Sequence, residues 1–97
     1  MAIYKALDRE TVVVSDSVQT LTESKIAPNI YYALIQVQSA QIRYTIEGTD
    51  PVASTTGFIK YPSDFFEVWG EYNLKNLKMI REGSVDGDLE VEYFGAA

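Results

Sequence analysis

The sequence predicts an all-β protein that folds as a single antiparallel β-sandwich of about seven to eight short strands. Apolar and polar residues alternate over several short segments, which is the two-residue period of a β-strand. Clusters of Gly, Pro, Asp and Ser separate these segments, as turns separate strands. The length of 97 residues suits one domain with a single core, so we interpret residues 1–97 as one β domain.

The first predicted strands lie in the N-terminal half of the chain. The segment "TVVVSDSVQTLT" begins with a β-branched run from Val12 to Val14, which favours a strand. The next segment, "NIYYALIQVQ", is the most apolar of the chain. Its alternation places Tyr31, Ala33, Ile35 and Val37 on one face and Tyr32, Leu34, Gln36 and Gln38 on the other. Ser39 and Ala40 lead into "QIRYTIEG", and we expect these two segments to form a hairpin.

The stretch "EGTDP" ends the strand that contains Tyr44. Gly48 can adopt a positive φ, and Pro51 lacks a backbone N–H, so sheet pairing should stop here. We expect the Asp50 carboxylate to accept backbone N–H groups across the turn. The stretch is therefore interpreted as a turn rather than as a ligand-binding loop.

The C-terminal half contains three further strands and one helical turn. The segments "FIKY" and "FFEVW" are predicted strands that Pro62, Ser63 and Asp64 separate. Leucine spacing in "YNLKNLKMIREG" predicts a short helical or 3₁₀ turn over Tyr72 to Leu77, followed by a strand from Lys78 to Glu82. The segment "LEVEYF" forms the last strand, and the Asp86-Gly87 pair before it is an ordinary hairpin signal.

The inward faces of these strands predict the core. The members share an apolar side chain on the more apolar face of an alternating segment. They are Ile35, Val37, Ile42, Tyr44, Ile46, Phe66, Val68, Leu89, Val91 and Tyr93.

Composition excludes several classes of function. The chain has no Cys and no His, which removes thiolate nucleophiles, disulfides, the usual zinc ligands and the commonest general base. We therefore expect no enzyme and no cofactor. A net charge of −6 without a basic stripe argues against nucleic-acid binding, and no apolar run is long enough to span a membrane. Asp86, Asp88 and Glu90 alternate as calcium ligands can, but they lack the rest of a calcium-binding loop.

Several aromatic residues fall on the less apolar faces of their strands. In "FFEVW", Glu67 shares its face with Phe65 and Trp69, and this face should be the wetter one. Tyr32, Leu34 and Phe94 also lie on such faces. Either a loop or the N-terminal segment covers these side chains, or they form a protein contact surface.

Residues 1–10 are a candidate N-terminal arm. Ile3 and Tyr4 lie in a segment too short to bury itself and too apolar for a solubility tail. We expect contact to order this arm, along its own sheet edge or against a neighbouring subunit. The expected interface residues are Ile3, Tyr4, Tyr32, Leu34, Phe65, Glu67, Trp69 and Phe94.

Two resemblances extend this interpretation. The fragment "IRYTIEGTDPVAST" resembles the Y-T-x-D-G-T-x-P strand and turn of immunoglobulin-like domains appended to bacterial carbohydrate-active enzymes, with Glu47 where those domains usually carry Asp. This resemblance implies an immunoglobulin-like sandwich and a carbohydrate-binding accessory module; a jelly-roll-like sandwich is the alternative fold.

The second resemblance is wider and covers roughly residues 30–95. The order "ALIQVQSAQIRYTIEGTDPVASTTGFI", an aromatic strand, then "NLKNLKMIREGSVDGDLEVEYF" resembles small β-sandwich virion proteins of tailed bacteriophages. It implies a virion component made in the host cytoplasm, with capsid decoration as the first role and a neck or tail part as the next. The implied partners are the major capsid protein, other virion subunits or further copies of the chain. The resemblance carries over no catalytic residue.

Overall fold

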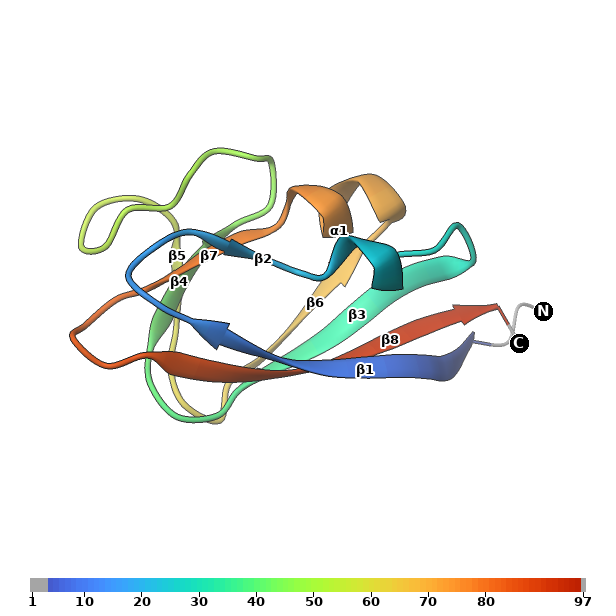
Figure 1. Cartoon of the computed structure of the whole chain (residues 1–97), viewed down its shortest axis with the longest axis horizontal. Coiled ribbons are helices and arrows are strands. Elements are labelled where there is room, and N and C mark those ends of the chain that lie inside the picture. Colours follow the sequence, from blue (N-terminus) through green and yellow to red (C-terminus); the bar gives the residue numbers. More distant parts are fainter. Residues whose placement is uncertain (1–3, 97) are drawn as a thin grey trace.

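The computed structural model describes residues 4–96, and within that range the chain forms eight strands, one 3₁₀ turn and one short helix (Figure 1). In chain order they are β1 (Tyr4–Val14), β2 (Gln19–Thr20), η1 (Glu23–Lys25), β3 (Ile30–Val37), β4 (Ile42–Thr45), β5 (Phe58–Lys60), β6 (Phe65–Trp69), α1 (Glu71–Asn76), β7 (Lys78–Arg81) and β8 (Gly87–Ala96). Two four-stranded antiparallel sheets result, β1-β8-β3-β6 and β2-β7-β4-β5. We call them the first and the second sheet. The predicted all-β sandwich is confirmed.

β8 lies in the middle of the first sheet, between β1 and β3. Its alternation decides which side chains enter the core, because Leu89, Val91 and Tyr93 are buried while Glu90 and Glu92 are on the outer face. The strong alternation of "LEVEYF" therefore predicted both faces of this strand.

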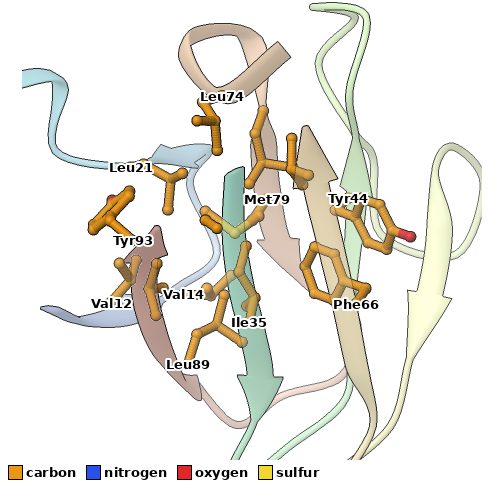
Figure 2. Packing of buried hydrophobic residues seen from close by; sticks show 14 of the residues in the cluster. Val12, Val14, Leu21, Ile35, Tyr44, Phe66, Leu74, Met79, Leu89 and Tyr93 are labelled. Carbon is orange, nitrogen blue, oxygen red and sulfur yellow. The ribbon is translucent and has the colours of Figure 1, made fainter. Parts of the chain in front are cut away.

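The core lies between the two sheets (Figure 2). Nine of the ten predicted core residues are buried. The exception is Ile46, which is partly buried against the core because β4 already ends at Thr45. The core also holds residues that the prediction lacked, namely Val12, Val14, Leu21, Ile26, Ile30, Ala33, Leu74, Leu77 and Met79. Leu74 enters it from α1, and Leu77 enters it from the extended position directly after α1. The helical turn predicted over Tyr72 to Leu77 is therefore present, one residue earlier at each end.

Both predicted hairpins are wrong. β3 and β4 belong to different sheets, and so do β7 and β8. The two crossing segments pack together: the Gln38 N–H donates to the Asp88 carbonyl, and the Glu82 N–H donates to the Gln41 carbonyl. Gly87 belongs to this contact, because a Cβ there would lie 2.8 Å from the Ala40 carbonyl oxygen. Turn residues mark where a strand ends, but they do not determine which sheet the next strand joins.

Tyr31 is also misplaced by the simple alternation of "NIYYALIQVQ". The pairing of β3 with β8 shifts between Ile30 and Tyr32, so the strand carries one extra residue. Ile30 is consequently buried, and Tyr31 is exposed instead of sharing the inner face with Ala33.

The stretch "EGTDP" is a turn after β4, as predicted, and Gly48 has a φ of +105°. Its carboxylates have other roles than expected. Glu47 accepts the backbone N–H and the hydroxyl of Thr49, whereas Asp50 accepts a hydrogen bond from Lys78 Nζ at 2.9 Å. The Asp50 carboxylate thus links the turn to β7 rather than capping the turn itself.

β1 begins at Tyr4, eight residues before the strand predicted at Val12. It pairs with β8 from Tyr4 opposite Ala96 to Val14 opposite Gly87, with a register shift between Ala6 and Asp8. Residues 4–10 of the predicted arm therefore lie along the edge of their own sheet, and residues 1–3 lie outside the described range.

Candidate interaction surface

The outer face of the first sheet is organised in rows that cross β8, β3 and β6. Rows arise because side chains directly opposite each other in antiparallel strands are neighbours. Tyr32 lies opposite both Phe94 and Trp69, and Leu34 lies opposite both Glu92 and Glu67. The face therefore carries an aromatic row beside an acidic row.

The aromatic row is a continuous stack of rings, which we call the aromatic stack and define as Phe94, Tyr32 and Trp69. The Tyr32 ring is 4.8 Å from Phe94 and 4.0 Å from Trp69, both in stacked orientation. Tyr4 approaches Tyr32 and Trp69 edge-on at 5.9 and 5.8 Å. Such contacts stabilise each pair by about 1 kcal/mol beyond burial. Trp69 nevertheless remains 46% exposed.

The acidic row consists of Glu92, Leu34 and Glu67. Leu34 is half-buried, and the two glutamates are exposed on either side of it. Two strand spacings separate the glutamates, so their Cα atoms are roughly 10 Å apart. Across residues 4–96, neither carboxylate has a hydrogen bond or an ion pair.

A third row contains Glu90, Gln36 and Phe65. Glu90 accepts hydrogen bonds from Thr11 Oγ1 at 2.7 Å and from Arg9 Nη2 at 2.5 Å. The Thr11 hydrogen bond, followed by the Arg9 hydrogen bond, lowers the pKa of Glu90 below its ordinary value. Phe65 is 55% exposed at the other end of the row, on the edge strand β6.

A hollow of about 250 Å³ lies over the second and third rows. Leu34 and Gln36 come from the central β3, with Phe65 on one side and Arg9, Glu90 and Glu92 on the other. Gln38 and Val91 complete the lining. The surface thus combines apolar area, amide groups and carboxylates around one concavity.

All the predicted interface residues within the described range lie on this outer face. They are Tyr4, Tyr32, Leu34, Phe65, Glu67, Trp69 and Phe94. Ile3 lies outside the described residues. β1 does bring Tyr4 against the edge of the aromatic stack, but Phe65 and Trp69 stay about half exposed.

Sequence reasoning missed Arg9, Gln36, Gln38, Glu90 and Glu92 as parts of this surface. The outward direction of Glu90 and Glu92 could be predicted from alternation. Their position beside Leu34 and Gln36 depends on the register between β8 and β3, for which the sequence contains no local signal.

The acidic residues near Gly87 are spread over separate contacts. Asp86 pairs with Arg81 Nη1 at 2.8 Å, while Glu90 contacts Arg9 and Thr11. Within the described part of the chain, no three Asp, Glu, His or Cys side chains gather in a way that could hold a metal ion. No helix there has the length and apolarity needed to cross a membrane.

Comparison of the chain with protein-family models, with curated proteins and with solved structures finds no match.

Proposed function

We propose that this chain is a non-catalytic structural protein of a bacteriophage virion, which binds the capsid exterior and stabilises it. The outer face of the first sheet would be its contact surface. The observation that carries the proposal is the continuous exposed area from Phe65 to Trp69, joined to the aromatic stack. Aromatic residues with a charged rim are typical of protein interfaces. The resemblance of residues 30–95 to small virion β-sandwiches supports a virion as the proposed assembly.

A particle that carries many copies of the protein needs only a low binding affinity at each individual contact. A lattice of attached subunits multiplies weak individual sites, so a surface of this modest size suffices. Contact through the first sheet alone would leave the second sheet facing away from the particle, which is the arrangement that a subunit coating a surface needs.

Imaging of purified particles with and without the protein tests the assignment. Particles stripped of it should lose tolerance to heat or low salt, and addition of the protein should restore that tolerance. The variant Phe65→Ala/Trp69→Ala should fail to restore it. Tyr72→Ala is the matched control, because Tyr72 is 74% exposed on α1, outside the proposed surface.

Two outcomes would contradict capsid decoration. Stripped particles that keep their tolerance would exclude a stabilising role. Density for the protein inside the neck or tail would assign it to that part of the virion.

A carbohydrate-binding accessory module is the second candidate. It is favoured by the hollow, where the exposed Phe65 lies beside the amides of Gln36 and Gln38, since sugars stack on aromatic rings and bond to amides. Titration with a glycan panel, followed by Trp69 fluorescence, separates the two functions. Millimolar or tighter binding that Phe65→Ala abolishes would favour the carbohydrate module, because Phe65 lines the hollow and its loss leaves Trp69 in place as the fluorophore.

A further inference from the structure

The charge of the outer face restricts which partner it can accept. Three carboxylates, those of Glu67, Glu90 and Glu92, lie in or beside the hollow, and Arg9 is the one cation among its lining residues. The Arg9 guanidinium already bonds to Glu90. Glu67 and Glu92 have no hydrogen bond or ion pair within the described residues, although Arg9 also lies opposite Glu92 in the pairing of β1 with β8. Three carboxylates against one guanidinium leave this part of the surface with a net charge of −2.

Apolar area lies directly beside these carboxylates. Glu67 has Phe65 and Trp69 as its neighbours along β6, and Leu34 separates it from Glu92. Arginine and lysine side chains have an apolar stem and a cationic head, and guanidinium groups also stack on aromatic rings. A basic side chain therefore matches both features of the surface.

The same charges argue against a second copy of the chain as the occupant. A twofold contact through this face would place the Glu67 and Glu92 pairs of two copies against each other. Like charges brought together at an interface oppose binding. Anionic partners are opposed for the same reason, and a neutral sugar would leave the net negative charge of the face uncompensated.

We infer that the outer face binds a basic segment of the partner protein, with an arginine in the hollow. This inference rests on the proposed function and names the chemistry of its partner. The arginine stem lies on Leu34 and Phe65, and its guanidinium pairs with Glu92 at the wall of the hollow. A second basic residue pairs with Glu67 between Phe65 and Trp69.

Trp69 is the single tryptophan of the chain, so its fluorescence reports directly on this face. The test titrates the full-length protein with a pentaarginine peptide at low salt. Binding should change Trp69 fluorescence, weaken as salt is added, and exceed the binding of pentalysine. The isosteric variant Glu67→Gln/Glu92→Gln should bind roughly tenfold more weakly, since it removes two ion pairs.

Asp16→Asn/Glu23→Gln is the matched control. It also removes two negative charges, but from exposed positions in the segments on either side of β2, neither of which belongs to a strand of the first sheet. It should bind pentaarginine like the unmodified protein. Equal weakening by both double variants, or no weakening by Glu67→Gln/Glu92→Gln, would overturn the inference.

Binding to stripped particles separates this inference from the proposed function. If Phe65→Ala/Trp69→Ala loses particle binding while Glu67→Gln/Glu92→Gln retains it, the face is an interface but its partner is not basic. If both variants bind particles normally, the proposed contact surface itself is wrong. A dimer in sedimentation that Phe65→Ala dissociates would assign the face to a second copy and also overturn the inference.

Discussion

Gly95 occupies a position in β8 that admits no side chain. A Cβ there would lie 2.0 Å from the Asn29 carbonyl oxygen and 3.0 Å from Leu7 Cδ1. The backbone atom cannot withdraw, because the Asn29 carbonyl accepts the Ala96 N–H at 3.1 Å. Gly95→Ala should therefore destabilise the protein by about 2 kcal/mol. Urea unfolding measures this, with Gly83→Ala as the control, since a Cβ at Gly83 meets nothing within 4 Å. Equal stability of both variants would show that the segment at Asn29 shifts freely.

Tyr93 combines full burial with a polar contact at the edge of the core. Its hydroxyl donates to Glu10 Oε2, and Glu10 Oε1 accepts the Thr22 hydroxyl at 2.6 Å. Burial, and then the hydrogen bond to Glu10, raises the pKa of Tyr93 well above its ordinary value of 10.0. A raised tyrosine pKa means that this stability is fully present below about pH 10 and declines above it, where the unfolded chain ionises more readily.

Tyr93→Phe should lose about 2 kcal/mol at neutral pH, because one hydrogen bond to a carboxylate disappears. Its stability should then fall less steeply above pH 10 than that of the unmodified protein. Some alkaline decline should persist, since burial also raises the pKa of Tyr44. Urea unfolding at pH 7 and pH 10.5 checks both expectations. Parallel declines in the two proteins would mean that Tyr93 does not govern alkaline stability.

At the scale of elements, the pairing of β1 changes the effect on stability that we expect when residues 1–10 are removed. If residues 1–10 formed an independent arm, the truncated domain would fold normally but attach to its particle more weakly. The structure instead pairs Tyr4–Glu10 with β8, and Lys25 bonds to Asp8 at 3.1 Å. Removal should therefore lower the melting temperature by roughly 10 °C or more, which corresponds to a loss of about 2 kcal/mol.

Glu10→Gln in the full-length chain is the control for this truncation. It alters the contacts with Tyr93 and Thr22 while β1 keeps its pairing, so its melting temperature should lie between those of the truncated and unmodified proteins. A truncated protein as stable as the full-length one would show that residues 4–10 contribute no stability, as the arm hypothesis holds.

The elements also show how much could be predicted from the sequence. Alternation is a local property, so it predicted the inner and outer faces of β6 and β8 correctly. Strand partners depend on distant residues, so the crossings after Val37 and Arg81 appeared as hairpins. Tyr31 fell on the wrong face because a one-residue bulge leaves no mark in a regular apolar run. The candidate surface was predicted as a set of residues, but its rows could not be, since they require the register of three strands.

On the scale of the whole molecule, the proposed contact surface lies on the outer face of one of the two sheets. The first sheet carries the aromatic stack and the carboxylates of Glu67 and Glu92 on one face, and within residues 4–96 neither carboxylate has an ion pair. A net charge of −6 over 97 residues gives every copy the same sign, so free copies repel one another, and the proposed basic partner would attract them. Under the proposed function, this face would serve attachment to the particle.

The position of β8 between β1 and β3 also determines when the first sheet can form during synthesis of the chain. A ribosome makes β1 and β3 long before it makes β8, the strand that joins them (Figure 1). Until β8 has been made, the edges of β1 and β3 that pair with it remain unpaired. The Tyr32 ring of β3 also lacks its neighbour Phe94 until then. The first sheet therefore closes only after β8 has been synthesised, and the proposed contact surface on its outer face forms in the same late step.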